Sequence, residues 1–200
     1  MRVSPVAWLF DDLSQVLEEA EKTALPTHNH PEGIKGAQAV AHAIWHFRKS
    51  KESHLPDDEA MKAFKNIARS YYDDFDTRVY PKGKFDETCM DAVPLSFHIL
   101  SKTSSFEDAI RLAISHGGDS DTIGAIVGSI AEARFGIPQD MKEKAISYLT
   151  DDMKDVIGNW TFANSILPSP SGTGGYLQNL KTKIYFPLRL IIFSLKAKYF

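Results

Sequence analysis

Two aspartates and a threonine lie within four residues of one another in the run His116-Gly-Gly-Asp-Ser-Asp-Thr-Ile-Gly124. Their carboxylate and hydroxyl oxygens are the ligands that hard cations such as Mg²⁺, Mn²⁺ and Ca²⁺ prefer. The two glycines before Asp119 leave the backbone free to direct Asp119, Asp121 and Thr122 toward one point. The apolar segment that follows predicts a helix, whose positive N-terminal end favours carboxylates. The run therefore predicts a site for a divalent cation at a helix N-terminus.

Two other interpretations of this run are helix capping and calcium binding. Asp, Ser and Thr are favoured at helix N-caps, but one cap needs one acceptor side chain and this run supplies four. A calcium loop of the EF-hand type requires a bidentate Glu at its twelfth position, and counting from Asp119 that position is Ile130. The EF-hand interpretation fails, and we favour a ligand site over simple capping.

A second polar run, Thr27-His-Asn-His-Pro-Glu-Gly-Ile-Lys-Gly36, gathers two histidines, an amide and a carboxylate. We predict that it forms a loop before a helix, and loops on rigid scaffolds often carry function. The His28-x-His30 pair suggests zinc, but the chain has no companion cysteine motif and no His-Glu-x-x-His. On residue types alone, a ligand role and a role in orienting the next helix are equally supported.

The bulk composition describes one globular domain. The chain has 200 residues, of which 43% are hydrophobic and 24% are charged. Its net charge of −3 argues against nucleic acid as a partner. The single cysteine, Cys89, excludes an internal disulfide framework, and we interpret it as a small buried residue in a protein of the reducing cytoplasm.

Helical periodicity recurs along most of the chain, whereas no run alternates as a strand would. The sequence therefore predicts an all-α fold. The expected helices run from Asp12 to a point before Pro26, from near Gly33 to Phe47, from Asp57 to Tyr71, from Val93 to Leu100 with Pro94 in the first turn, from the capping box at Ser105 to Gly117, from Ile123 to a stop at Gly136, and from Met141 to Leu149, with a loop over Tyr80–Phe85.

The last part of the chain differs in composition from the rest. We place a helical domain over residues 1–165 and a basic, apolar tail over residues 166–200. The apolar segment from Ile184 to Leu195 is well short of the roughly 20 residues that a membrane-spanning helix needs. We therefore expect no membrane span.

Taken together, the two polar runs resemble the ADP-ribosylglycohydrolase family, which includes the dinitrogenase reductase-activating glycohydrolases. The matching motifs are Thr27–Gln38 and Gly117–Ile123, and the segments Met1–Pro5 and Phe85–Pro94 are also similar to recurring pieces of that family. The resemblance spans roughly Met1 to Phe162, with its motifs in the right order.

The resemblance implies an all-α fold, a compact multi-helix orthogonal bundle of the family's type that is incomplete at the N-terminus. It also implies an enzyme that hydrolyses the glycosidic bond between ADP-ribose and a protein side chain or a small molecule. It implies a two-metal centre with Mg²⁺ or Mn²⁺. Carried over by position, Asp119, Asp121 and Thr122 are metal ligands, and the two aspartates are also the catalytic carboxylates. The same carry-over gives substrate-binding roles to His28, Asn29, His30, Gly118 and Ser120.

The resemblance begins downstream of two of the family's N-terminal motifs, a Gly-Asp helix and a Thr-Asp-Asp metal motif. We therefore expect an N-terminally truncated member that lacks half of the metal shell and self-associates through exposed core surface. Thr150-Asp151-Asp152 has the right letters, but it lies at a late helix start, where capping explains it better. An inactive remnant that binds ADP-ribose or a partner is the alternative to an active hydrolase.

Overall fold

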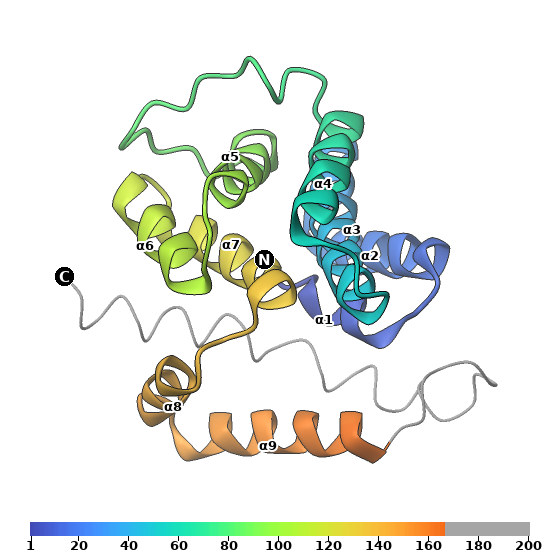
Figure 1. Ribbon diagram of the computed structural model, residues 1–200, viewed down its shortest axis with the longest axis vertical. Coiled ribbons are helices and arrows are strands. Elements are labelled where there is room, and N and C mark those ends of the chain that lie inside the picture. The colour runs from blue at the N-terminus through green and yellow to red at the C-terminus, as the bar shows by residue number, and fades with distance from the viewer. Residues whose placement is uncertain (167–200) are drawn as a thin grey trace.

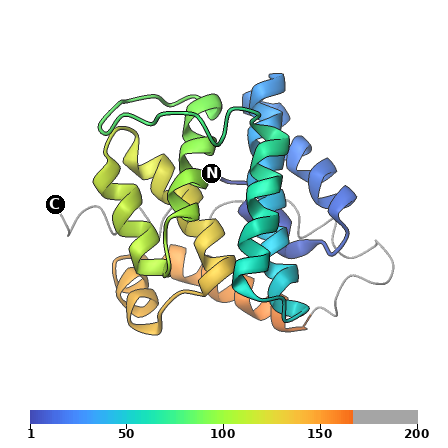
Figure 2. The ribbon, with the colours of Figure 1, turned by 45° about the horizontal axis from the view of Figure 1, so that its top comes forward.

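The chain folds as a bundle of α-helices. A computed structural model describes residues 1–166, with side chains described through Asn159. This described part contains helices and no β-strand, so the all-α prediction is confirmed (Figures 1 and 2). Most of the predicted tail, residues 167–200, lies outside it. The helices are α1 (Ser4–Leu9), α2 (Leu13–His28), α3 (Pro31–Glu52), α4 (Asp57–Tyr71), α5 (Cys89–Ser101), α6 (Phe106–His116), α7 (Ser120–Phe135), α8 (Gln139–Ser147) and α9 (Asp151–Ile166).

Helix α7 lies at the centre of the bundle, where it packs against α3, α5 and α6 (Figure 1). Its large apolar residues, such as Ile123 and Ile130, are fully buried. Its narrow residues Gly124, Gly128 and Ser129 are buried too, so neighbouring helices can approach its backbone from several sides. The predicted helix after the aspartate run therefore forms, and it is the closely packed centre of the bundle.

Two prolines stand inside helices, contrary to the sequence-based boundaries. Helix α5 begins at Cys89, so the prediction that Pro94 lies in a first turn is wrong. A proline has no N–H, which leaves the carbonyl of Met90 without its helical donor, and the guanidinium of Arg78 donates to that carbonyl instead. Helix α2 likewise continues past Pro26 to His28, where the sequence predicted an earlier end.

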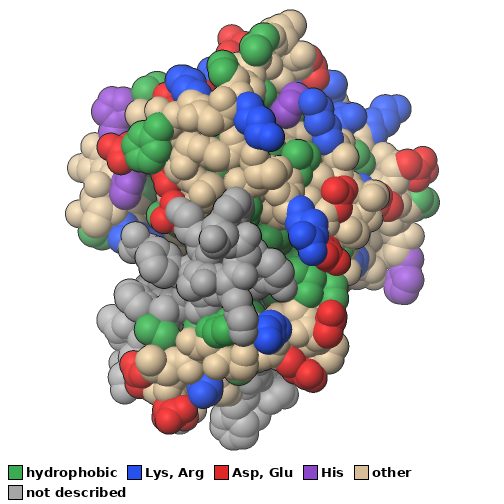
Figure 3. All heavy atoms as spheres, turned by 90° about the vertical axis from the view of Figure 1, so that its left-hand side faces the viewer, with side chains coloured by type: hydrophobic (Ala, Val, Ile, Leu, Met, Phe, Trp, Pro, Cys, Tyr) green, Lys and Arg blue, Asp and Glu red, His purple; other side chains and the backbone are tan. Residues whose placement is uncertain are grey.

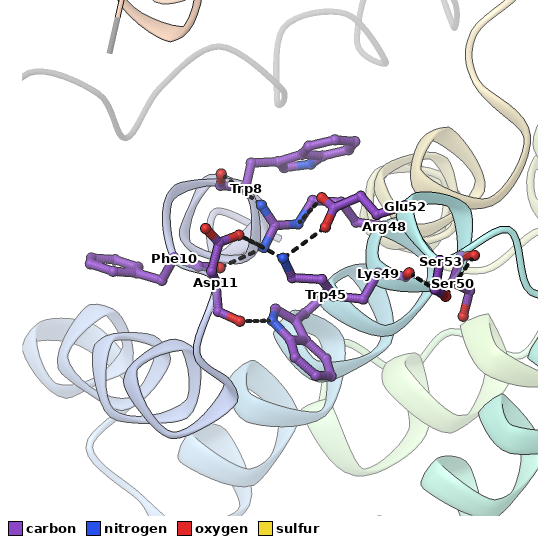
Figure 4. A network of polar contacts seen from close by, with 9 residues as sticks. All are labelled: Trp8, Phe10, Asp11, Trp45, Arg48, Lys49, Ser50, Glu52 and Ser53. Atoms are coloured by element: carbon purple, nitrogen blue, oxygen red, sulfur yellow. Dashed lines mark hydrogen bonds and ion pairs between the residues drawn. The ribbon is translucent and has the colours of Figure 1, made fainter. Parts of the chain in front are cut away.

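Helix α1 was not predicted from the sequence, and a network of charged contacts fixes it to α3 (Figure 4). The guanidinium of Arg48 donates to the carbonyl oxygens of Trp8 (3.3 Å) and Phe10 (2.6 Å), which end α1. The carboxylate of Asp11 accepts from Arg48 at 3.2 Å and from Lys49 at 2.7 Å. These contacts hold the first residues of the chain against the bundle.

Helices α8 and α9 lie together along one side of the bundle (Figure 1). Helix α8 and the helix start at Thr150 were both predicted, and Asp151 and Asp152 are exposed in the first turn of α9. On the face shown in Figure 3, acidic and basic side chains are intermixed, so this face is neither uniformly acidic nor uniformly basic. Among the described residues, no helix is long and apolar enough to cross a membrane.

The side chain of Arg134, near the end of α7, ties four elements together. It is only 7% exposed, and it donates to both carboxylate oxygens of Asp57 at the start of α4 (2.9 and 2.7 Å). It also donates to the carbonyl oxygens of Leu100 (3.2 Å) and Thr103 (3.0 Å) at the end of α5. Its guanidinium lies 5.8 Å from the ring centre of Phe47 on α3.

We predict that Arg134→Ala lowers the free energy of unfolding by about 2 kcal/mol, because it leaves the Thr103 carbonyl without its side-chain donor, removes one of the donors to the Leu100 carbonyl, and removes the cation that pairs with Asp57. Urea denaturation of the purified chain measures this change. Arg111→Ala is the matched control: Arg111 pairs with Glu107 on the surface with its side chain 68% exposed, and its loss should cost less than about 0.5 kcal/mol. Equal losses in the two variants would contradict this role of Arg134.

His42 on α3 is a largely buried titratable group. Its ring lies edge-on to Trp45 and Tyr71, and its Nδ1 is 3.3 Å from the Tyr71 hydroxyl. Burial, with a smaller contribution from His46, lowers the pKa of His42 to about 4. The neutral imidazole is therefore the form that the fold accommodates.

We predict that the fold loses stability as the pH falls from 6.5 toward 4. In that window the unfolded chain binds a proton at His42 that the folded chain does not, so acid favours unfolding. His42→Asn removes this contribution, and its free energy of unfolding, measured in urea at about pH 7 and about pH 4.5, should fall less than that of the unmodified chain. The exposed His54, changed to Asn, provides the control. A parallel fall in the His42 variant and the unmodified chain would refute the prediction.

Candidate functional site

The two polar runs that the sequence singled out meet in one cavity of about 650 Å³. His28 reaches it from the end of α2, and Asp119, Asp121 and Thr122 reach it from the start of α7. Its apolar wall comes from α3, α5 and α7. The fold thus brings together side chains that lie far apart in the sequence.

The histidine run is a helix junction and not the loop that the sequence predicted. Thr27 and His28 belong to the last turn of α2, and α3 begins at Pro31, so only Asn29 and His30 link the helices. The helices meet closely here: a Cβ on Gly33 would lie 2.6 Å from the carbonyl oxygen of His28. Glycine at this position lets the start of α3 pack against His28.

A short chain of polar contacts orients His28 in the cavity wall. Arg2, which also lines the cavity, donates to the carbonyl oxygen of Thr23 at 2.8 Å and to the hydroxyl of Thr27. The Thr27 hydroxyl is 2.7 Å from Nδ1 of His28. When the hydroxyl donates to Nδ1, the ring proton stands on Nε2, where His28 can donate to a ligand oxygen.

The aspartates stand at the positive end of α7. Asp119 occupies the N-cap position, yet its side chain makes no capping hydrogen bond of ordinary geometry, and the first helical bond runs from Ile123 N to the Asp119 carbonyl (3.0 Å). The carboxylate interacts with the backbone and the hydroxyl of Thr122, and it also lines the cavity. Partial burial raises the pKa of Asp119, and the carboxylate of Asp121 raises it further against the opposing effect of Thr122. The helix dipole favours negative charge at this position.

The double glycine before Asp119 serves a close backbone approach that the sequence did not reveal. Gly117 and Gly118 have φ angles of 79° and 70°, and a Cβ on Gly118 would overlap the carbonyl oxygen of Lys84. The backbone N–H of Gly83 donates to the carbonyl of His116 at 2.7 Å. The loop between α4 and α5 is thereby held against the turn that presents Asp119.

Several residues with a predicted substrate role do not line the cavity. Asn29 is exposed at the end of α2, and the ring of His30 accepts a hydrogen bond from the backbone of Glu32 at 3.2 Å, as an N-cap does. Gly118 packs against the loop, and Ser120 is buried in the first turn of α7. Substrate binding by these four residues stays a prediction.

The cavity also contains residues to which the sequence gave no role: Arg2, Glu87 and Cys89. Cys89 is half-buried and lines the cavity, so the prediction of a simple buried residue missed its position. The available signal was that both segments, Met1–Pro5 and Phe85–Pro94, resemble recurring family segments. Residue type alone did not assign them to a site.

The donor chemistry suits a hard cation. Asp119, Asp121 and Thr122 offer oxygen ligands on one helix turn, as Mg²⁺ or Mn²⁺ requires. Within the described residues, however, no group of three or more His, Cys, Asp or Glu side chains is arranged to hold a metal ion. The described residues thus fit one side of a metal site, and a two-metal centre stays a prediction.

Comparison with known proteins assigns the class. The model of the ADP-ribosylglycohydrolase family matches residues 1–167, and the chain belongs to that family. An uncharacterized protein of Archaeoglobus fulgidus is 30% identical over 155 residues, which cover 70% of this chain and 50% of that protein. The ADP-ribosyl-[dinitrogen reductase] glycohydrolase of Rhodospirillum rubrum is 27% identical over 114 residues, which cover 56% of this chain and 36% of that enzyme. The chain thus spans half or less of these curated relatives, and no solved structure matches it.

We predict that Gly118→Ala destabilises the chain by about 3 kcal/mol, because the new Cβ adds an overlap with Lys84 to the strain of a positive φ. Gly136→Ala is the control, since Gly136 has a φ of 79° but open space around it and should lose only about 1 kcal/mol. Urea denaturation of both variants compares the two. Similar losses would show that the loop does not press on Gly118.

Proposed function

We propose that this chain hydrolyses the glycosidic bond that links ADP-ribose to a protein side chain or a small molecule. The observation that carries the proposal is the shared cavity of His28, Asp119, Asp121 and Thr122 in a member of the ADP-ribosylglycohydrolase family. The activity for which the Rhodospirillum rubrum relative is named supports the same reaction class. The single cysteine supports a reducing, cytoplasmic setting.

The residues of the cavity suit the separate tasks of this reaction. His28 and Arg2, which Thr27 connects, are donors for a phosphate or ribose oxygen. A carboxylate, Asp119 or Asp121, accepts the proton of the attacking water. The reaction needs no nucleophilic serine or cysteine.

Asp119, Asp121 and Thr122 are the residues that would hold Mg²⁺ or Mn²⁺. Such an ion, when bound, supplies Lewis-acid polarisation of water and orientation of the ribose hydroxyls. The narrow residues of α7 behind these ligands keep their turn in place, because they are packed on all sides.

A second candidate is a binding module for ADP-ribose without catalysis. It is favoured by one observation, namely that the described residues contain no group of three or more metal-ligating side chains of the His, Cys, Asp and Glu types. Under this alternative the cavity binds ADP-ribose through His28 and Arg2, and the glycosidic bond stays intact.

We predict that the chain releases ADP-ribose from modified peptides in the presence of Mg²⁺ and that Asp121→Ala lowers kcat/KM at least about 100-fold, because a metal ligand and a candidate base are lost together. Chromatography of released ADP-ribose measures the rate. Asp58→Ala, an exposed aspartate in the first turn of α4, should retain full activity.

The hydrolase proposal fails if the unmodified chain releases no ADP-ribose and Mg²⁺ does not raise its melting temperature. In that case, a rise in melting temperature with ADP-ribose alone would support the binding module.

A further inference from the structure

The loop between α4 and α5 has one aromatic anchor. Of the large apolar side chains in residues 76–88, Val79 and Phe85 are 81% and 67% exposed, whereas Tyr80 packs against the core. The ring centre of Tyr80 lies 4.8 Å from that of His98 on α5, and the Tyr80 hydroxyl is buried. Because a loop is held on a bundle chiefly by the apolar area that it buries, the contact between Tyr80 and His98 is the main anchor of this segment.

Beyond Tyr80, the attachments of the loop are polar. The backbone N–H of Gly83 donates to the carbonyl of His116 at 2.7 Å, and the ammonium of Lys84 lies 3.2 and 3.6 Å from two carboxylates. Residues 81–85 are exposed, and exposed ion pairs contribute little to stability. Figures 1 and 2 show the loop leaving α4, reaching across to α6 and returning to the start of α5. We call residues 76–88 the strap.

His98 lies where the fold opposes its protonation. Burial lowers the pKa of its imidazole from the ordinary value of 6.5, and Lys102 and His116 lower it further. Among the described residues, the titratable groups that face it are Lys102 on α5, His116 at the end of α6 and Tyr80 in the strap, and none of them is a carboxylate. When Tyr80 lifts away, water reaches the imidazole and its pKa returns toward 6.5. The lifted strap then binds the proton more tightly, so acid favours it below about pH 6.5.

We propose that residues 76–88 form a pH-sensitive strap beside the cavity: neutral His98 holds the strap closed through Tyr80, and protonation of His98 releases it. The strap bears on the candidate site in two ways. Glu87, at its end, lines the cavity, and the carbonyl of Lys84 packs against Gly118. Release of the strap therefore loosens the turn that presents the aspartates.

Amide hydrogen exchange of the full chain tests the proposal, with the Gly83 amide as the reporter of the closed strap. Its protection factor should fall severalfold between about pH 7.5 and about pH 5.5, and at most about tenfold, the limit for one histidine whose pKa is 6.5 when the strap is released. His98→Phe keeps a ring against Tyr80 but cannot bind a proton, so its Gly83 protection should be the same at both pH values. His54→Asn, at an exposed histidine, should keep the fall of the unmodified chain.

An equal fall in His98→Phe and the unmodified chain would overturn the proposal. A rise in protection with acid would also overturn it, since it would show that the imidazolium binds the Tyr80 ring more strongly than burial and the neighbouring charges oppose it. These measurements need no substrate, so their outcome is separate from that of the hydrolase proposal.

A second variant tests the anchor itself. Tyr80→Ala should lower the Gly83 protection factor severalfold already at about pH 7.5 and remove its further fall with acid, because the strap is then released at both pH values. Val79→Ala, at the exposed neighbour, should leave the protection unchanged. Unchanged protection of Gly83 in Tyr80→Ala would show that the polar contacts alone hold the strap and would refute the proposal.

Discussion

Close packing around α7 is the constraint on which the site depends. Glycine, alanine and serine line several faces of this helix, and α3, α5 and α6 therefore approach its backbone directly. A helix packed in this way has little freedom to rotate or slide, because its neighbours fill the space around it. Its first turn carries Asp119, Asp121 and Thr122, so the position of these side chains follows from the interior of the bundle.

The part of the cavity lining that comes from α2 and the start of the chain is held by different forces. The end of α2 meets α3 through the close approach at Gly33, and α1 is fixed to α3 by the charged contacts of Arg48 and Asp11 (Figure 4). These contacts bring Arg2 and His28 into the same wall. The third wall, from the loop before α5, is held by its backbone contact with the turn before α7. Three distant segments thus form one cavity.

The electrostatics of this cavity agree with its class. Two carboxylates share one helix turn, and partial burial with mutual repulsion raises the pKa of Asp119. The helix dipole of α7 compensates part of that repulsion, and a divalent cation would compensate more. The donors Arg2 and His28 line the same cavity as the carboxylates. This division of charge is a property of the assembled cavity and of none of its segments alone.

The sequence by itself determined the helical class, the capping box at Ser105 and the residue chemistry of the aspartate run, because these depend on local spacing. The structure confirms the capping box with a hydrogen bond from Asp108 N to the Ser105 hydroxyl (3.1 Å). Local signals failed at Pro26 and Pro94, which both lie inside helices. At Pro94, the distant side chain of Arg78 donates to the Met90 carbonyl in place of the missing N–H. Only the tertiary structure decided that His28 shares a cavity with the aspartates and that Tyr80 rests on His98. Such meetings depend on which helix faces pack together, and that information lies in contacts between residues far apart in the sequence.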